Sequence, residues 1–267
     1  MTQDKARTIQ QLFDLTGKTA LVTGGSRGLG LQMAHALGEA GAKVMLSSRK
    51  AEDLQESAAE LKAAGIDVDW IAADCSKEAD IRALADETIR RFGHVDILVN
   101  NAGAAWGAPA EDHPVEAWDK VMNLNIRGYF ILSQHIAKHS MIARQSGRII
   151  NVASIAGLGG NPREMTTIAY NTSKGAVVNF TRALACEWGA YNITVNAICP
   201  GFFPSKMTMG TLKALGEEKL AAHAPLRRLG DDEDLKGLCV LYASDAGKHI
   251  TGQWLAVDGG VSVVTGG

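Results

Sequence analysis

The chain is predicted to be an α/β protein with one doubly wound, Rossmann-like domain: a seven-stranded parallel sheet with helices on both faces. Three observations predict this fold. Short runs of apolar and β-branched residues alternate with longer segments of helical periodicity. A glycine-rich turn joins the first such run to the first helical segment. The sequence also contains no linker, internal repeat or low-complexity segment, so the elements form one domain over residues 1–267.

Seven short apolar runs are predicted to be the strands. Runs of four to six such residues are typical of parallel strands that helices cover on both faces. The first run ends in the glycine-rich turn, and the others follow helical segments or loops. They are Lys18–Thr23, Lys43–Ser47, Val68–Ala72, Val95–Val99, Arg148–Val152, Ile193–Ala197 and Gln253–Val257.

Helical periodicity fills the intervals between these runs. The first two segments each end at a glycine, as helix C-termini often do. The predicted helices cover residues 29–40, 51–64, 77–92, 115–144, 168–190 and 231–243. Residues 1–14 are expected to be an N-terminal extension.

The segment 200–225 departs from this alternation, because it has prolines near both ends, a helical middle and no strand pattern. Open α/β sheets place ligand-covering segments after the carboxyl ends of strands, so we expect a lid over the substrate. An ordinary pair of surface helices is the alternative.

Composition narrows the functional classes. With 46% hydrophobic residues, 21% charged residues and a net charge of −2, the chain resembles a soluble globular protein without a general attraction for nucleic acid or membranes. The first dozen residues lack the apolar core of a signal peptide, and no apolar stretch approaches the length of a membrane span. We therefore expect a cytoplasmic protein.

The cysteines predict neither a metal site nor disulfides. They are widely scattered and form no Cys-x-x-Cys pair. Such cysteines are typical of buried, reduced thiols. They are Cys75, Cys186, Cys199 and Cys239.

The turn after the first predicted strand reads Thr23-Gly-Gly-Ser-Arg-Gly-Leu-Gly30. Glycines there permit backbone conformations forbidden to other residues and let a pyrophosphate approach the helix N-terminus. The spacing differs from the common Gly-x-Gly-x-x-Gly fingerprint, and glycines in such turns can serve steric needs alone. Its position in a βαβ unit nevertheless favours a dinucleotide site.

The second predicted strand indicates which dinucleotide. About 20 residues past such glycines, an acidic residue normally holds the ribose 2′-hydroxyl of NAD. This chain reads Leu46-Ser-Ser-Arg-Lys50 instead, with no carboxylate. Arg49, together with Arg27 in the glycine turn, suits a 2′-phosphate and predicts NADP(H). Two solvated surface arginines are the alternative.

Tyr170 and Lys174 stand four residues apart in a predicted helix and therefore share one face. A neighbouring ammonium favours phenolate over phenol, so the spacing predicts a lowered pKa for Tyr170. Such a tyrosine would exchange protons near neutral pH.

Six motifs in order resemble the short-chain dehydrogenase/reductase family from Gly17 to Gly260. They are Thr23-Gly-x-x-x-Gly-x-Gly30, Asn100-Asn-Ala-Gly103, Asn125, Ser154, Tyr170-x-x-x-Lys174 and Pro200-Gly201. The resemblance implies an enzyme in which Tyr170 is the general acid or base and Lys174 lowers its pKa and binds the nicotinamide ribose. It also implies that Ser154 holds the substrate oxygen and that Asn125 anchors a proton-relaying water.

The resemblance also implies the cofactor contacts, with Asp74 facing the adenine and Ser205 standing where the family usually has threonine. The expected cofactor-binding residues are Gly24, Ser26, Arg27, Gly28, Leu29, Gly30, Ser48, Arg49, Asp74, Cys75, Asn101, Ala102, Gly103, Tyr170, Lys174, Pro200, Gly201, Phe203 and Ser205.

Two departures from the family pattern concern the substrate. Ser154 and Tyr170 stand farther apart than is usual, because of an insertion at 158–167 that is expected to border the substrate. Lys206 stands where related reductases often carry an acid. It would favour an anionic substrate or be a solvated lysine.

Within the family, the chain is most similar to NADPH-dependent 3-oxoacyl reductases and to gluconate 5-dehydrogenase-like members. An acyl substrate needs an apolar groove, for which Trp106, Phe202 and Met207 are the expected substrate-contacting residues. We therefore expect reduction of a 3-oxoacyl-type or lipophilic ketone to a secondary alcohol, with a sugar-acid or polyol dehydrogenase as the alternative. A cofactor sensor without turnover is the alternative from another class, although the chain keeps all four catalytic positions.

The family is commonly tetrameric, and the apolar segment 254–264 would suit packing between subunits. A homotetramer or homodimer is therefore expected.

Overall fold

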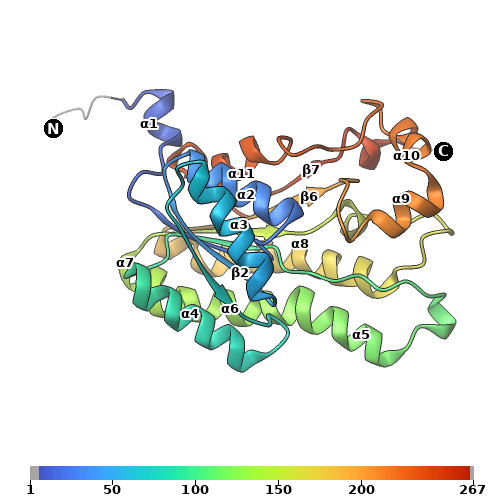
Figure 1. Cartoon of the computed structure of the whole chain (residues 1–267), viewed down its shortest axis with the longest axis horizontal. Helices are drawn as coiled ribbons and strands as arrows, with labels where there is room; N and C mark the ends of the chain where they lie inside the picture. Colours follow the sequence, from blue (N-terminus) through green and yellow to red (C-terminus); the bar gives the residue numbers. More distant parts are fainter. Residues whose placement is uncertain (1–5, 265–267) are drawn as a thin grey trace.

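The computed structural model describes residues 6–264, and it contains a seven-stranded parallel sheet with the order β3-β2-β1-β4-β5-β6-β7 (Figure 1). This confirms the predicted fold class. The strands are β1 (Thr19–Thr23), β2 (Lys43–Ser48), β3 (Val68–Ala72), β4 (Ile97–Asn100), β5 (Gly147–Val152), β6 (Ile193–Pro200) and β7 (Trp254–Val257).

Two strand boundaries differ from the prediction by two residues or more because of pairing between distant residues, and the others agree within one residue. β4 begins at Ile97 and not at Val95, because the preceding residues turn so that the Asp96 carboxylate accepts from the Thr19 amide at 3.0 Å. β6 continues to Pro200, where that residue stands in register with Val257 of β7.

Successive side chains along each strand point to opposite faces of the sheet, and helices cover both faces. Ala20 and Val22 of β1 point into the core under α2 (Gly28–Glu39), α3 (Ala51–Ala63) and α11 (Lys236–Ala243). Leu21 points into the opposite core, under α4 (Glu78–Phe92), α6 (Gly128–Ile136) and α8 (Ile168–Trp188). Because both faces of such a strand are buried, its consecutive residues must be apolar, and the sequence of β1 meets this condition.

The predicted helix 115–144 is one helical path with two π-helical turns. Its parts are α5 (Val115–Met122), η2 (Asn123–Arg127), α6, η3 (Ala137–Met141) and α7 (Ile142–Arg144). Such turns within α-helices often occur at functional sites, and the first one contains Asn125.

Two helical predictions need correction. The helix expected over 231–243 begins at Lys236, because Asp234 accepts from the backbone N–H of Asp231 and pairs with Arg228, which holds the preceding residues in turns. The N-terminal extension contains a short helix, α1 (Ile9–Phe13), that the sequence pattern did not predict. Thr8 caps it by accepting from the backbone N–H of Gln11.

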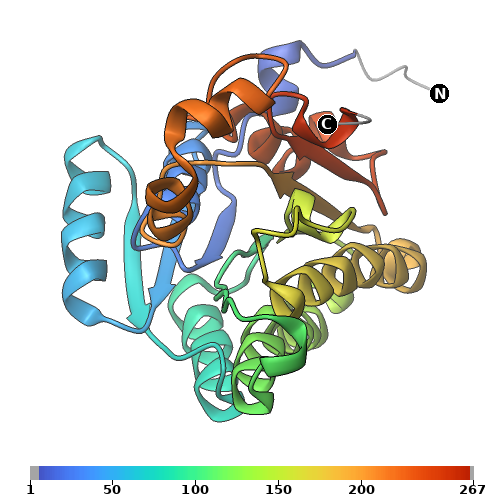
Figure 2. The same ribbon diagram turned by 90° about the vertical axis from the view of Figure 1, so that its right-hand side faces the viewer.

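The segment 200–225 contains two short helices, α9 (Met209–Leu215) and α10 (Glu217–His223). Figure 2 looks onto the end of the molecule where these two orange helices lie across the sheet. Phe203 anchors the start of this segment: its side chain is only 3% exposed, and a Cβ added to Gly230 would lie 2.4 Å from its ring.

Three of the four cysteines are buried, but Cys186 on α8 is exposed, which corrects the prediction for that residue. Cys186 lies on the outer side of the helix, whereas Leu184 and Ala185 reach the core. Within residues 6–264, no helix is long and apolar enough to cross a membrane. The predicted domain also includes residues 1–5 and 265–267, which lie outside the described part of the chain.

Candidate active site

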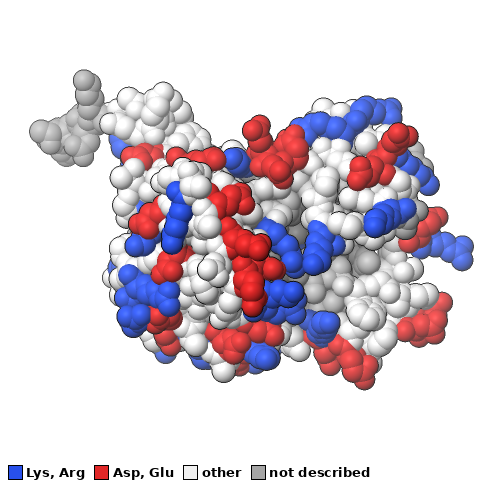
Figure 3. All heavy atoms as spheres, viewed as in Figure 1, with Lys and Arg blue, Asp and Glu red and all other residues white. Residues whose placement is uncertain are grey.

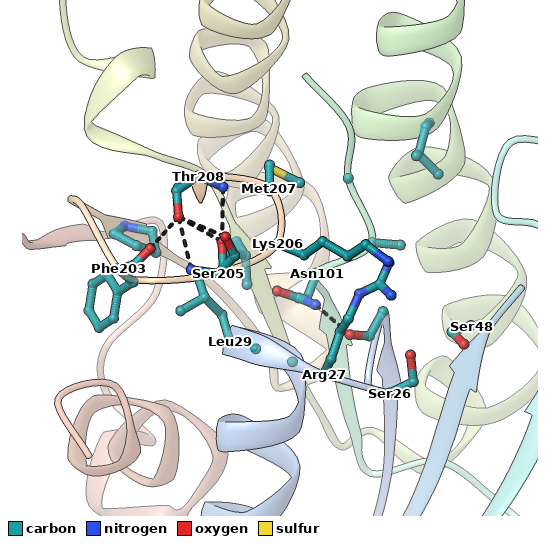
Figure 4. Close-up of a pocket in the computed structure, with 18 of the residues that line it drawn as sticks. Ser26, Arg27, Leu29, Ser48, Asn101, Phe203, Ser205, Lys206, Met207 and Thr208 are labelled. Atoms are coloured by element: carbon teal, nitrogen blue, oxygen red, sulfur yellow. Dashed lines mark hydrogen bonds between the residues drawn. The ribbon is translucent and has the colours of Figure 1, made fainter. Parts of the chain in front are cut away.

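A cavity of about 890 Å³ opens at the carboxyl ends of the strands. Segments that follow β1, β2, β3, β4, β5 and β6 all contribute to its wall, as expected where the strand order of a doubly wound sheet reverses. Every residue that the sequence predicted to bind a cofactor lines this cavity. Figure 4 shows how the glycine turn and the segment 203–208 face each other across it.

The glycine turn is built so closely that side chains cannot enter it. Gly24 has a φ of +64°, which favours glycine. A Cβ on Gly30 would lie 2.2 Å from the carbonyl oxygen of Gly24. Asn101 fixes the turn, because its Nδ2 donates to the carbonyl oxygens of Thr23 at 2.9 Å and Gly24 at 3.2 Å.

This cradle precedes α2, a twelve-residue helix whose first three residues, Gly28 to Gly30, line the cavity. A helix N-terminus carries a partial positive charge and orphan N–H donors, so it suits a phosphate group. The residues present therefore fit the pyrophosphate of a dinucleotide.

Cationic side chains line the same end of the cavity: Arg27, Arg49 and Lys50. Asp53 of α3 pairs with Arg27, with 3.3 Å between Nη1 and Oδ2. Figure 3 shows Lys and Arg side chains gathered around a hollow in the centre of this face.

The predicted catalytic side chains of Ser154, Tyr170 and Lys174 line the cavity together. Ser154 lies directly after β5, where its hydroxyl accepts from the Ala156 amide at 3.1 Å. Tyr170 and Lys174 project from α8, and Nζ of Lys174 is 5.7 Å from the centre of the Tyr170 ring.

The predicted pKa of Tyr170 is wrong in direction. Burial raises the pKa of this phenol, and the Ser154 side chain offsets only part of the rise. Burial also lowers the pKa of Lys174 to about 8. The physical reason is desolvation, which disfavours phenolate and ammonium alike.

Asn125 lies behind the cavity wall and is fully buried. Its amide exchanges two hydrogen bonds with the backbone of Ala104, at 2.8 and 2.9 Å, and donates to Oγ of Ser173 at 2.9 Å. It thus joins the segment after β4 to the helix that carries Tyr170 and Lys174.

The 3₁₀ turn η4 (Ile155–Gly157) packs directly on α8 beside the predicted catalytic side chains. A Cβ on Gly157 would lie 2.5 Å from the carbonyl carbon of Lys174. Only glycine permits this approach, which brings Ser154 to the face of the helix that presents Tyr170.

Comparison with known proteins identifies the family. The model of the short chain dehydrogenase family matches residues 18–215. The chain belongs to the short-chain dehydrogenase family. The match covers β1 to α9, and thus the glycine cradle, Ser154, Tyr170 and Lys174.

Individual relatives of this dehydrogenase cover almost its whole length. It is 41% identical to the rhamnolipids biosynthesis 3-oxoacyl-[acyl-carrier-protein] reductase of Pseudomonas aeruginosa, over 93% of this chain and 97% of the relative. It is 35% identical to gluconate 5-dehydrogenase of Gluconobacter oxydans, over 94% and 97% of the two chains.

Solved structures show the same fold. The gluconate 5-dehydrogenase of Burkholderia cenocepacia in complex with NADP and tartrate has a TM-score of 0.91 and 34% identity, over 97% of this chain and 100% of that chain. The Pseudomonas aeruginosa RhlG/NADP active-site complex has a TM-score of 0.87 and 40% identity, over 94% and 99%.

Only one of the three predicted substrate-contacting residues of this dehydrogenase lies at the cavity. Met207 lines the cavity, whereas Trp106 and Phe202 do not. Trp106 stands 45% exposed on the segment after β4, because that segment turns outward to pair with the insertion, where the Ala108 amide donates to the Thr166 carbonyl at 2.9 Å. Phe202 precedes the buried anchor Phe203, which takes the place at the cavity wall instead.

The insertion 158–167 contributes no residue to the cavity wall as described. It is instead held by polar contacts to α8, since Nδ2 of Asn161 donates to Oγ1 of Thr167 at 3.0 Å and to Oδ1 of Asn171 at 3.1 Å. The insertion therefore borders the helix turn that carries Tyr170.

The sequence-based prediction of the cofactor site missed several cavity residues. Most of them stand directly before or after a predicted site residue, and that adjacency was the available signal. Val152, Asp53 and Asp232 had no such signal, because the tertiary packing of distant segments places them at the cavity. The missed residues are Lys50, Asp53, Ala73, Leu124, Val152, Ala153, Pro204, Thr208 and Asp232. Within the described residues, no group of His, Cys, Asp and Glu is arranged to hold a metal ion.

Proposed function

We propose that this dehydrogenase is an NADP(H)-dependent oxidoreductase that reduces a ketone to a secondary alcohol. One observation carries the proposal: Ser154, Tyr170 and Lys174 line the same cavity as the glycine cradle and the arginines. A proton donor and a dinucleotide site therefore share one continuous space.

The nicotinamide cofactor supplies a hydride when it is bound. The chain supplies the proton: the O–H of Tyr170 donates to the carbonyl oxygen, and the hydroxyl of Ser154 holds that oxygen by a hydrogen bond. The raised pKa of Tyr170 keeps the phenol protonated before reduction. Lys174, held at 2.7 Å by the Val152 carbonyl, stands ready to bind ribose hydroxyls and to favour the phenolate that forms.

NADP(H) is the proposed cofactor because two arginines line the part of the cavity where the ribose phosphate is expected. Ser48, at the end of β2, stands where NAD-binding proteins need a carboxylate, and Arg27 and Arg49 line the cavity beside it. The structures from Burkholderia cenocepacia and Pseudomonas aeruginosa, both NADP complexes, support this proposal.

We favour a 3-oxoacyl-type or lipophilic ketone as substrate. Leu124 and Met207 flank the cavity, and unpaired polar groups of a sugar acid would be costly against such apolar walls. The gluconate 5-dehydrogenase of Burkholderia cenocepacia, which has a TM-score of 0.91 to this chain, favours the second candidate, a gluconate 5-dehydrogenase-type reaction. Relatives of both kinds are similar to this chain.

The test is NADPH oxidation with 3-oxoacyl thioesters, lipophilic ketones and 5-ketogluconate. We expect turnover of the first two classes, a loss of about 10²- to 10⁴-fold in kcat for Tyr170→Phe, and little change for the exposed control Tyr191→Phe. Full activity of Tyr170→Phe would refute the mechanism. NADPH binding without any turnover would favour the cofactor sensor, and a preference for NADH would refute the assignment of Arg27 and Arg49.

Further parts of the proposal concern assembly and location. We propose a single domain over residues 1–267, with 200–225 as a lid over the substrate, in a cytoplasmic homotetramer or homodimer. Exposed apolar side chains support assembly: Phe130 stacks edge-on against Phe180, and Trp254 and Leu255 lie open on the edge strand β7. Light scattering during size-exclusion chromatography would test the oligomeric state.

A further inference from the structure

The segment that follows β6 brings one lysine, Lys206, to the cofactor end of the cavity. The base of the segment lies over the glycine turn, because a Cβ on Gly28 would be 3.8 Å from the Cβ of Ser205. Gly28 is the first residue of α2, where the proposed pyrophosphate site lies. The backbone of Lys206, next to Ser205 in the chain, therefore lies beside that site.

A turn fixed by two hydroxyl side chains presents Lys206. Oγ1 of Thr208 accepts from the Ser205 amide at 2.9 Å and donates to the Phe203 carbonyl at 2.6 Å. The Thr208 amide donates to the Ser205 carbonyl at 3.1 Å, which closes the turn. Because Phe203 is buried against Gly230, the turn is attached to the core and Lys206 is held at its tip.

The lysine points toward another cation. Figure 4 shows the Lys206 side chain extending across the cavity toward Arg27 of the glycine turn. In the described part of the chain, no carboxylate lies within 4.0 Å of its ammonium, whereas Asp53 pairs with Arg27. Two like charges that face one open cavity repel each other unless an anion lies between them.

We propose that Lys206 binds a phosphate group of the dinucleotide and thereby ties the segment 203–216 to the bound cofactor. This rests on the proposed function. A substrate anion is the other source of negative charge, but Tyr170 marks the reacting end of the cavity, whereas Lys206 extends toward the glycine turn. The lysine at this position thus serves the cofactor and not the substrate.

The first experiment measures NADPH and NADH dissociation constants, in the absence of substrate, by titrating nicotinamide fluorescence. For Lys206→Gln we expect NADPH binding to weaken by about 3- to 10-fold, because one partly solvated charge–phosphate contact is lost. Lys206→Arg should retain most of the affinity. Lys213→Gln, an exposed lysine on α9 that does not line the cavity, is the matched control and should bind as the unmodified chain does.

Comparison of the two cofactors identifies the phosphate. An equal loss for NADPH and NADH would place the ammonium on the pyrophosphate, and a loss confined to NADPH would place it on the 2′-phosphate. Unchanged affinity for both, with a raised KM for an anionic substrate or without one, would overturn the proposal.

Hydrogen–deuterium exchange provides a readout that does not depend on turnover. NADPH should slow exchange over residues 203–216 in the unmodified chain and in Lys213→Gln, and should slow it less in Lys206→Gln at saturating NADPH. Equal protection in all three would also count against the proposal. If the unmodified chain binds neither NADPH nor NADH, the proposed function itself fails, which is distinct from a Lys206 variant that binds normally.

Discussion

The Nζ of Lys174 donates a hydrogen bond to the carbonyl oxygen of Val152, with 2.7 Å between the two atoms. Lys174 is only 3% exposed, and its ammonium lies at the end of β5, 5.5 Å from the centre of the Tyr129 ring. No carboxylate within the described residues pairs with it. The chain therefore holds the Lys174 cation, proposed to be catalytic, in a place that disfavours its charge.

This burial predicts a pH-dependent stability. The pKa of Lys174 is lowered to about 8 from 10.5, so between these values the unfolded chain binds more protons than the folded one. Lys174 should then contribute a rise in the free energy of unfolding across this window, of up to about 3 kcal/mol, which the buried cysteines oppose because burial raises the pKa values of their thiols. Lys174→Met should lack this rise in denaturant unfolding at pH 7 and pH 10, whereas exposed Lys248→Met should keep it. Equal slopes for all three proteins would contradict the prediction.

Gly157→Ala should damage catalysis. The new Cβ would meet the carbonyl carbon of Lys174 at 2.5 Å, so η4 must move away from α8 and carry Ser154 with it. A shift of about 1 Å in a reacting group can cost about a hundredfold, so we expect kcat to fall by 10- to 100-fold. Gly159→Ala has no neighbour within 4 Å and serves as the control in the same steady-state assay. Equal kcat values for the two variants would show that the close approach has no catalytic role.

Gly30→Ala should abolish tight cofactor binding. Its Cβ would lie 2.2 Å from the Gly24 carbonyl oxygen and 2.5 Å from Nδ2 of Asn101, so the cradle must open. We expect NADPH to bind at least about tenfold more weakly by fluorescence titration. Gly237→Ala, in a helix and free of neighbours within 4 Å, should leave binding intact and raise stability by about 0.5–1 kcal/mol. Normal NADPH affinity in Gly30→Ala would show that the glycine cradle does not contribute to cofactor binding.

Asp53→Asn should tighten NADPH binding. Oδ2 of Asp53 lies 3.3 Å from Nη1 of Arg27, so a ribose phosphate has to compete with this carboxylate for the guanidinium. Exposed ion pairs contribute little, so we expect the NADPH dissociation constant to fall by about two- to fivefold while that of NADH stays the same. Asp67→Asn, whose partner Lys43 lies away from the cavity, is the control. Weaker NADPH binding in Asp53→Asn would mean that the pair positions Arg27 for the cofactor.

Local patterns in the sequence determined the seven strands, the glycine turn and the shared helical face of Tyr170 and Lys174. These features depend on residues close together in the chain, where periodicity and backbone freedom act directly. The same locality explains why the predicted cofactor residues, which follow successive strands, all line one cavity.

Only the tertiary structure determined the burial of these side chains and the partners that they contact. Burial reversed the expected pKa shift of Tyr170, because desolvation depends on every segment packed around it. Pairing of the insertion with Ala108 placed Trp106 outside the cavity, and helix packing brought Asp53 to Arg27. Contacts between residues far apart in the chain set such details, and no local pattern records them.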